Sequence, residues 1–574
     1  MLRIPFGLAL LAVGLMYLVS LGAAPLLDPP EGFHVAVAES LRASGDWITL
    51  RVDSVRYFDK PPVPYWLMAL SFGAVGPSEA AARMWPALSA LGVAAVTGRI
   101  GVMLGGPRVG LLAALFVASN LGVFLIGRQV KPDLAFILWI VLAFAGFVVA
   151  YRGGGRWGLA VFYGALGLAA LTKDALGALG PLLVVALFVW LTRERPYRAW
   201  VPWWGVLLLL AVALPWYVAV EMRNSGFLWY TVVDNHLLNF TRQRVFPDED
   251  VPLSALEFLA VNVLAFLPWT LALPWGVARA FKRPWADAEA RLWMLFALWA
   301  LLVLGFFTLS SFKLPHYGLP AFPALALLAA RAWDDSIEAI PGAAAPRVLM
   351  VPICILFAVL AVAFALAAAG RLPLHDAALV KVDVAARNLA ARGEAIPQGP
   401  LEPYVSILVK CVVVFAIATV GMAIAAARRW PAVGVGVALA AMIAFLPMAG
   451  EGMTQFARSR SVRPLAEALA QRRAPGDRVV HEGSLQNSAS LLLRIPGPVA
   501  LVHGRQSNLA FGATFPEARE IFWDPPRLQA AWEGPERCFL VSAVAPSRSV
   551  VKTLAPVHLI AQAGGRWLYS NRLE

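Results

Sequence analysis

Long apolar runs recur along the chain and constrain its fold more than any other feature of the sequence. A membrane-spanning helix needs about 17 to 25 apolar residues. We count thirteen candidate runs, near residues 5–25, 82–104, 108–127, 133–151, 157–172, 174–192, 202–222, 257–279, 292–311, 315–332, 349–369, 406–427 and 431–449. Hydrophobic residues make up 60% of the 574 residues and charged residues 14%. The sequence therefore excludes a soluble protein and predicts an all-α polytopic membrane protein with about 13 transmembrane helices.

The basic residues predict the orientation of these spans. Short loops rich in Lys and Arg stay cytoplasmic, and five such loops lie near Arg99, Arg152, Arg193, Arg279 and Arg428. We therefore expect a multi-pass protein of the bacterial inner membrane with a cytoplasmic N-terminus. The loops 26–81, 128–132, 223–256, 312–314 and 370–405 then face the periplasm. The first run resembles a signal peptide, but the many later spans favour an uncleaved helix.

The chain divides into two predicted domains. Residues 1–450 form the transmembrane domain, with the long first periplasmic loop at 26–81. Residues 451–574 are more polar and contain a helical pattern at 462–471, a Pro-Gly-Asp turn at 475–477 and strand-like runs at 478–481 and 538–541. They predict a small periplasmic α/β domain.

Charge, cysteine content and motif content argue against nucleic-acid binding, against a disulfide or zinc framework and against a nucleotide-linked donor. The net charge of +13 comes from basic residues in short loops, so it indicates topology and contact with membrane lipids rather than nucleic acid. Cys354, Cys411 and Cys538 lie far apart and form no disulfide framework or zinc spacing. Nucleotide-binding fingerprints are absent from the sequence, so any glycosyl donor would take another form.

The first loop carries a cluster suited to lipid-phosphate chemistry. Asp28 and Glu31 stand at the membrane edge, an amphipathic stretch at 35–47 is expected to lie in the interface, and Lys60 follows within an aromatic and proline-rich segment at 56–66. A carboxylate there can deprotonate an acceptor hydroxyl while cations neutralise a leaving phosphate. The alternative is that Asp28 and Glu31 cap the interfacial helix and Lys60 only reaches the interface.

Other loops on the same predicted side add ionisable groups next to apolar spans. These groups are Arg128, Lys131, Asp133, Lys173, Asp174, Lys313, His316 and Tyr317. Charges beside membrane spans are costly and tend to mark sites or ion pairs. Structural pairing, for example of Lys173 with Asp133 or Asp174, is an equal alternative at each position.

Seven motifs follow one another along the chain. They are Asp28 to Gly32 before 38–41, Ser44 to Trp47, Tyr57 to Pro62 with 65–67, Arg128 with Asp133, Leu171 to Lys173, Leu214 to Tyr217, and Lys313 to Tyr317 with 319–320. In this order they resemble the lipid-dependent GT-C glycosyltransferases, in the group of 4-amino-4-deoxy-L-arabinose lipid A transferase and the protein O-mannosyltransferases. The similarity extends over nearly the whole chain, and the tail segments 475–479 and 570–572 also resemble that family.

The resemblance implies a monomeric enzyme that uses a polyprenyl-phosphate sugar, without a nucleotide, and inverts the anomeric carbon. The acceptor would be lipid A, another envelope glycan or a protein. The donor phosphate would contact Lys60, Arg128 and Lys173, and the donor cavity would be lined by Asp59, Tyr57, Lys313, His316 and Tyr317. The acidic residue at the Asp59 position can lie near a divalent metal in relatives, but partner ligands are not evident in this sequence.

The expected catalytic aspartate is replaced in this chain. Relatives read Asp-Glu-Gly-Arg-Tyr where this chain has Pro30, Glu31, Gly32, Phe33 and His34. Because proline has no titratable group, a general base must come from Asp28, Glu31 or Asp133. Two alternatives follow. One is a GT-C scaffold without catalysis, acting in lipid-linked sugar binding or transport, and the other is a structural membrane protein whose charged loops pair only with one another.

Overall fold

Each predicted apolar run contains a helix in the computed structural model. The structure describes residues 3–173, 176–241, 243–246, 251–282, 285, 287–372, 384–392, 402–495, 497–505 and 507–573. The helices of the bundle are α1 (Arg3–Leu18), α4 (Glu79–Ser119), α5 (Leu121–Gly127), α6 (Asp133–Val149), α7 (Gly155–Ala170), α8 (Leu179–Thr192), α9 (Trp203–Arg223), α11 (Ala255–Ala265), α12 (Leu273–Phe281), α13 (Ala288–Leu309), α14 (Phe322–Ile337), α15 (Pro346–Ala368), α18 (Glu402–Arg428) and α19 (Pro431–Arg460). The predicted loop 370–405 lies largely outside the described residues.

Within the described part of the chain, seven helical stretches are long and apolar enough to cross a membrane, or eight if one bent pair counts as a span. Two of the seven stretches are hairpins. In α4, Gly106 has a φ of +83°, and a Cβ on Gly101 would lie 2.7 Å from the Gly110 Cα. Residues nine apart in a straight helix are separated by about 13 Å, so the chain turns back at this glycine.

The second hairpin joins α6 to α7. Gly153 has a φ of +95° there, and a Cβ on Gly146 would lie 2.6 Å from the Gly158 carbonyl oxygen. The two hairpins match the predicted pairs 82–104 with 108–127 and 133–151 with 157–172. The total of thirteen crossings stays a prediction.

The predicted run over 257–279 is helical but is not one continuous helix. The chain forms α11, then a bend of 98°, then a second helical segment from Trp269 to Phe281. The break contains Pro268, which cannot donate a backbone hydrogen bond and disfavours a continuous helix. The bend brings the start of α11 near the loop that precedes α14.

The first loop is more structured than predicted. It contains α2 (Gly32–Ser44), the two-stranded hairpin of β1 (Arg51–Val52) and β2 (Val55–Arg56), and α3 (Val63–Val75). The amphipathic stretch forms helix α2, which ends at Ser44, and its place in the membrane interface stays a prediction. Helix α3 was not expected. Buried residues of α2, including Val35, Val37 and Leu41, belong to the core that α2 and α3 share with the C-terminal domain.

The C-terminal domain is a six-stranded sheet in the order β5-β4-β3-β6-β8-β7. The strands are β3 (Arg478–Glu482), β4 (Ala500–Val502), β5 (Phe522–Trp523), β6 (Cys538–Ser542), β7 (His558–Ala563) and β8 (Arg566–Ser570). β5, β4, β3 and β6 are parallel, and β8 and β7 are antiparallel. Helices α20 (Arg463–Arg472) and α21 (Pro525–Glu533) accompany the sheet, which confirms the predicted α/β domain, its first helix and two of its strands.

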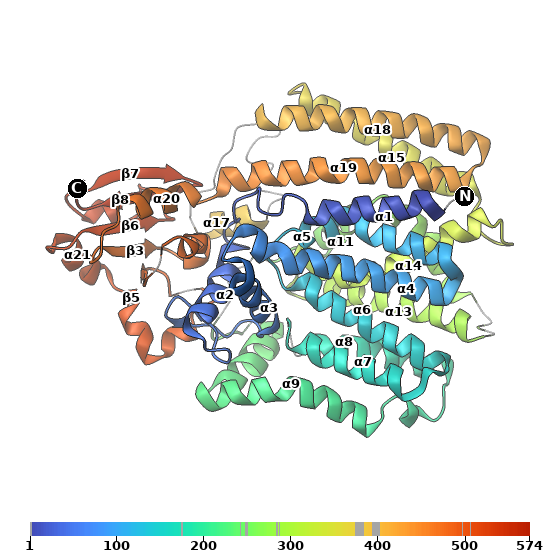
Figure 1. Ribbon diagram of the computed structural model, residues 1–574, viewed down its shortest axis with the longest axis horizontal. Helices are drawn as coiled ribbons and strands as arrows, with labels where there is room; N and C mark the ends of the chain where they lie inside the picture. Colours follow the sequence, from blue (N-terminus) through green and yellow to red (C-terminus); the bar gives the residue numbers. More distant parts are fainter. Residues whose placement is uncertain are drawn as a thin grey trace.

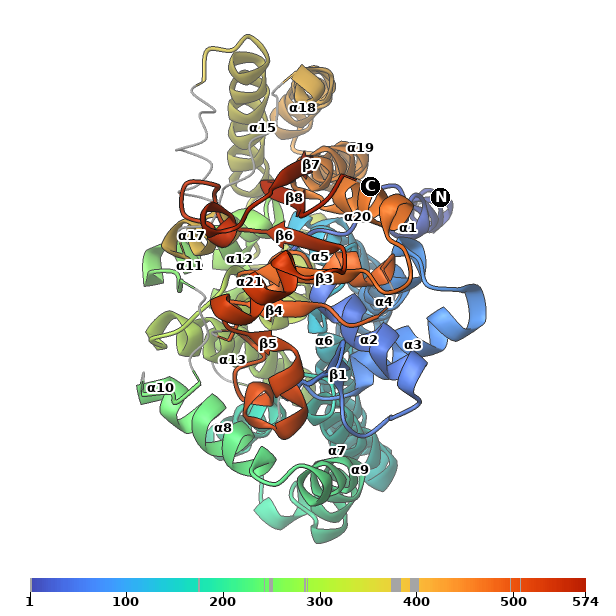
Figure 2. The same ribbon diagram turned by 90° about the vertical axis from the view of Figure 1, so that its left-hand side faces the viewer.

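Figure 1 shows this sheet at one end of the helix bundle, with α2 and α3 at the same end and the N-terminus at the opposite end. Figure 2, viewed from the sheet side, shows the strands lying across the end of the bundle. Helix α19 continues to Arg460 before the sheet domain begins. The first loop therefore lies between the bundle and the sheet domain.

A buried ion pair fixes the first loop to the bundle. The Arg83 guanidinium of α4 donates two hydrogen bonds to the Glu31 carboxylate, at 2.8 and 2.7 Å. Glu31 also accepts from the backbone N–H groups of Leu27 and Val130, each at 2.9 Å. Arg83 donates further to three carbonyl oxygens at residues 21, 24 and 25. We call this network the Glu31–Arg83 pair; it joins α4, the end of the first span and the loop before α6.

Removing one member of this pair tests its importance. We predict that Arg83→Met lowers the free energy of unfolding by about 3 to 5 kcal/mol, because it leaves the Glu31 charge buried without its partner. Thermal unfolding of the detergent-solubilised protein measures the change. A matched control is Arg42→Met, which breaks the exposed Arg42–Glu39 pair and is expected to cost less than about 1 kcal/mol. Equal effects of the two substitutions would contradict the assignment.

Candidate active site

The predicted site residues divide into two groups. Asp28, Glu31, Arg128 and Lys313 are bound to backbone, to Arg83 or to the C-terminal domain. A second region contains Asp59, Lys60, Asp133, Lys173, His316 and Tyr317. The first group holds the fold together. The second group is the candidate site.

Asp28 joins the first loop to the C-terminal domain. Its carboxylate accepts from the Ser490 backbone N–H at 3.1 Å and from the Ser490 hydroxyl. Burial raises the pKa of Asp28 to about 6, although the hydrogen bonds from Ser490 oppose that shift. Asp28 and Glu31 each have an exposed fraction of 2%, and the pairs described above occupy their oxygens. Both carboxylates are thus engaged in structural contacts.

Arg128 and Lys313 cap helix C-termini. Arg128 donates to the carbonyl oxygens of Tyr17, Val19 and Ser20 at 3.2, 2.9 and 3.2 Å, at the end of α1. Lys313 donates to the carbonyl oxygens of Thr308 and Ser310 at 3.1 and 2.7 Å, at the end of α13. Cations at this position satisfy free carbonyls and complement the helix dipole.

The first part of the candidate site lies at the start of α6. Asp133, the first residue of that helix, accepts from the Lys173 ammonium at 2.5 Å, and His316 Nε2 lies 3.8 Å from the same carboxylate oxygen. The Lys173 nitrogen also lies 5.0 Å from the Tyr317 ring centroid. The loops after α7 and before α14 therefore meet at the N-terminus of α6, which confirms the alternative that Lys173 pairs with Asp133.

The second part lies just before α3. The Lys60 ammonium donates to the Asp59 carboxylate at 2.9 Å, and the other Asp59 oxygen accepts from the Asn235 amide at 3.3 Å. Burial favours the neutral form of Asp59, but the nearby Lys60 and Arg244 cations dominate and hold the pKa of Asp59 below its usual value. Asp59 is therefore ionised and orients Lys60.

His34 connects the two parts. Its Nδ1 lies 2.8 Å from the Tyr65 hydroxyl, and that hydroxyl donates to Tyr57 at 3.4 Å. Burial and the neighbouring Lys60 and Lys131 cations lower the pKa of His34 to about 4, against an opposite effect of Asp133 and Asp59. These charges come from both parts, so Asp59, Lys60, Lys131 and Asp133 act electrostatically on one side chain.

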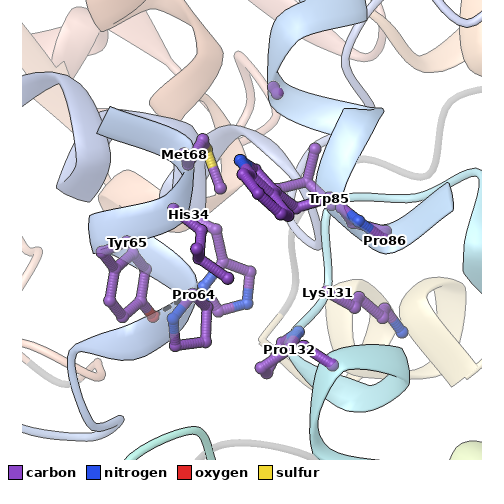
Figure 3. A pocket seen from close by; sticks show the side chains of 12 residues that line it. His34, Pro64, Tyr65, Met68, Trp85, Pro86, Lys131 and Pro132 are labelled. Atoms are coloured by element: carbon purple, nitrogen blue, oxygen red, sulfur yellow. Dashed lines mark hydrogen bonds between the residues drawn. The ribbon is translucent and has the colours of Figure 1, made fainter. Parts of the chain in front are cut away.

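His34 and Lys131 line a small cavity of about 20 Å³ beside α3, α4 and α6. Figure 3 shows His34 between Tyr65 and Pro64 on one side and Lys131 and Pro132 on the other. The rest of the lining is mostly apolar, including Met68, Trp85 and Pro86. The cavity thus combines an apolar wall with titratable groups.

Three helices begin at the candidate site. Helix α2 starts at Gly32, α3 at Val63 and α6 at Asp133. Each N-terminus carries a partial positive charge, although the Val63 N–H of α3 donates to the Leu171 carbonyl oxygen at 3.1 Å. Together with Lys60, Lys131 and Lys173, they make this region favourable for an anion.

Sequence reasoning did not assign His34, Lys131 or Arg83 to the site or its support. His34 was visible only as a departure from the tyrosine of relatives, and Lys131 as a neighbour of Asp133. Arg83 lies inside an apolar run. An isolated arginine is costly there, so its presence indicates a buried partner. Among the described residues, no group of three His, Cys, Asp or Glu side chains is placed to hold a metal ion.

A bundle of apolar helices, short helices in the first loop and a sheet domain at the same end make up the fold. Residues 40–231 match the family model of dolichyl-phosphate-mannose-protein mannosyltransferase. The chain superposes on the crystal structure of ArnT from Cupriavidus metallidurans bound to undecaprenyl phosphate with a TM-score of 0.81, at 24% identity over 100% of this chain and 99% of that one. The overall fold is therefore that of ArnT.

Curated relatives point to the same group. The chain is 29% identical over 372 residues to the undecaprenyl phosphate-alpha-4-amino-4-deoxy-L-arabinose arabinosyl transferase of Shewanella sediminis, covering 63% of this chain and 65% of that protein. It is 31% identical over 345 residues to the enzyme of the same description from Pseudomonas aeruginosa, covering 57% and 59%. The chain thus aligns with somewhat less than two thirds of each relative. The resemblance predicted from the motifs is confirmed.

The contact between Asp28 and Ser490 gives a test of pH dependence. Because burial raises the folded-state pKa of Asp28 from 3.8 to about 6, its contribution to stability is present below about pH 4 and is lost as the pH rises through 6. The free energy of unfolding therefore falls by roughly 3 kcal/mol over this pH range.

We predict that Asp28→Asn removes this part of the decline in unfolding free energy between pH 4 and 6. Thermal unfolding at several pH values measures the difference from the wild type. Asp524→Asn is the control, because Asp524 is an exposed N-cap and asparagine caps equally well. Parallel pH curves for the wild type and Asp28→Asn would contradict the raised pKa.

Proposed function

We propose that the chain is a membrane glycosyltransferase that moves a sugar from polyprenyl (undecaprenyl) phosphate to lipid A, another envelope glycan or a protein. The observation that carries the proposal is the meeting of Lys60, Lys131 and Lys173, which all act electrostatically on His316, beside one small cavity. The similarity to arabinosyl transferases and to the ArnT fold supports the same conclusion.

The proposed topology follows the distribution of charge. The protein lies in the bacterial inner membrane with about 13 crossings, its N-terminus in the cytoplasm and its sheet domain in the periplasm. The positions of the N-terminus and the sheet domain at opposite ends of the bundle support this orientation (Figure 1). The protein acts as a monomer on the periplasmic side. A divalent ion near Asp59 stays a prediction of the resemblance.

Phosphate release is the step that the site stabilises. When the bond between the anomeric carbon and the phosphate oxygen breaks, the leaving polyprenyl phosphate gains negative charge. Lys60, oriented by Asp59, and Lys173, oriented by Asp133, place ammonium groups that can offset that charge. The carboxylates thus hold the cations in position before the donor arrives, which lowers the cost of ordering them.

The geometry separates the three carboxylates expected as general bases. Asp133 lies in the candidate site, where it contacts Lys173 and His316. Asp28 and Glu31 lie in the contacts that hold the first loop. We assign Asp133 to the orientation of Lys173, and Asp28 and Glu31 to the positioning of the loop.

The second candidate function is a scaffold that binds or transports lipid-linked sugar without catalysis. Pro30, at the position of the relatives' catalytic aspartate, favours it. Such a protein would retain donor binding at the cations but would form no glycosylated product.

A transfer assay separates the two functions. Purified protein is incubated with undecaprenyl-phosphate-linked 4-amino-4-deoxy-L-arabinose and with lipid A, a glycan or a Ser/Thr peptide, alongside Asp133→Asn, Asp28→Asn and Glu31→Gln. The proposed enzyme forms glycosylated acceptor and free undecaprenyl phosphate in equal amounts, and Asp133→Asn lowers kcat more than the other two relative to the amount of folded protein. Donor binding by the wild type without product would support the scaffold instead.

Lys60 provides a direct test of phosphate binding. We predict that Lys60→Met raises the Kd for undecaprenyl phosphate by roughly 30-fold, about 2 kcal/mol, because the phosphate loses a charge-assisted hydrogen bond. Binding of a fluorescent or radiolabelled lipid measures the change. The control is Lys410→Met, which removes an exposed lysine paired with Glu451. An unchanged Kd for Lys60→Met would place the phosphate elsewhere.

A further inference from the structure

The described carboxylates near the candidate site are all paired. Glu31 is bound to Arg83, Asp28 to Ser490, Asp59 to Lys60 and Asp133 to Lys173. Pro30 has no titratable group. Glu31, Asp59 and Asp133 are held by cations, and a carboxylate held by a cation is a weaker proton acceptor than a free one. Asp28 is buried against Ser490 of the C-terminal domain, away from the cations of the candidate site. The proton of an acceptor hydroxyl therefore needs another destination.

His34 meets the geometric requirements of a proton acceptor. It lies on the first turn of α2, four residues after Pro30, and lines the small cavity beside α3, α4 and α6 (Figure 3). Its Nδ1 contacts the Tyr65 hydroxyl, which in turn donates to Tyr57. In this chain of hydrogen bonds, Nδ1–H donates to Tyr65, and the unprotonated nitrogen is Nε2. Tyr65 thus selects the tautomer in which Nε2 is the base.

The charged groups around His34 control its protonation from every element packed against it. Lys60 and Asp59 precede α3, Tyr65 lies on α3, and Lys131 and Asp133 lie at the start of α6. Burial and the two lysines keep the imidazole neutral, consistent with a pKa of about 4. An anionic phosphate beside Lys60 would offset the cations and raise the proton affinity of Nε2. Donor binding therefore strengthens the base when it is needed.

We propose that His34 is the general base of the transfer and that the acceptor group is a hydroxyl; this inference rests on the proposed function. The acceptor oxygen forms a bond to the anomeric carbon of the donor sugar while its proton moves to His34 Nε2. The bond from the anomeric carbon to the phosphate oxygen breaks, and its electron pair leaves with the polyprenyl phosphate. The imidazolium then loses its proton to the leaving phosphate or to water. His34 thus replaces the aspartate that Pro30 has displaced.

The test compares His34→Gln with the wild type in the transfer assay, using the undecaprenyl-phosphate aminoarabinose donor and hydroxyl acceptors. General-base catalysis contributes about 10²- to 10⁴-fold, so kcat is expected to fall at least about 100-fold while the donor Kd changes less than about threefold. The pH profile of kcat has an acid limb in the wild type, and this limb is absent in His34→Gln. His558→Gln, on strand β7 of the sheet domain, is the matched control and keeps wild-type kcat.

Rescue distinguishes catalysis from structural support. Pro30→Asp restores the carboxylate of relatives. We therefore expect the double variant Pro30→Asp with His34→Gln to have a kcat at least about tenfold above that of His34→Gln alone, with an acid limb at lower pH. Tyr65→Phe gives a second reading if His34→Gln folds poorly, because it keeps the imidazole but removes the partner of Nδ1. We expect it to lower kcat and to shift the acid limb.

The possible results separate the role of His34 from the proposed function. A His34→Gln protein with kcat within about threefold of the wild type, or an unchanged acid limb in it, overturns the base assignment and leaves the proposed function intact. An unchanged kcat and pH profile in Tyr65→Phe also overturns it. A wild-type protein that binds the donor but transfers sugar to none of the acceptors overturns the proposed function, and this inference with it.

Discussion

The Glu31–Arg83 pair is the interaction on which the arrangement of the site depends. It fixes the start of α2 against α4 and, through the Val130 N–H, against the loop that leads into α6. His34 follows Glu31 by one turn, and Lys131 follows Val130 directly. A single buried ion pair therefore sets the distance between the first loop and α6, the two segments that face each other across the cavity. Breaking such a pair costs several kcal/mol, so the site and the fold are linked.

Structural and chemical roles are divided among similar residues. Arg83, Arg128 and Lys313 satisfy carboxylate or carbonyl oxygens within the protein, whereas Lys60 and Lys173 are held by Asp59 and Asp133 beside the cavity. Residues of the same type therefore have different roles, which depend on their partners. The cations that remain near the cavity are the ones suited to a lipid phosphate.

The sequence alone predicted much of the fold and part of the site. Apolar runs located the helices, because their length has a physical minimum in a bilayer, but the sharp bend at Pro268 and the short helix α3 depend on tertiary packing. The grouping of Asp59, Lys60, Asp133, Lys173, His316 and Tyr317 on one side was predicted from topology. The structural contacts of Asp28 and Glu31 could not be predicted in this way. Their partners Ser490 and Arg83 lie 462 and 52 residues away, and no local pattern connects them.

The location of the donor phosphate tests the account most directly. An experimental structure of the wild-type protein with bound undecaprenyl phosphate measures the distance from each phosphate oxygen to the surrounding cations. We expect a phosphate within hydrogen-bond distance of Lys60, on the side of the cavity that His34 faces, with Arg128 still bound to the end of α1. A phosphate bound at Arg128 or outside the first loop, with Lys60 still paired only with Asp59, would contradict it.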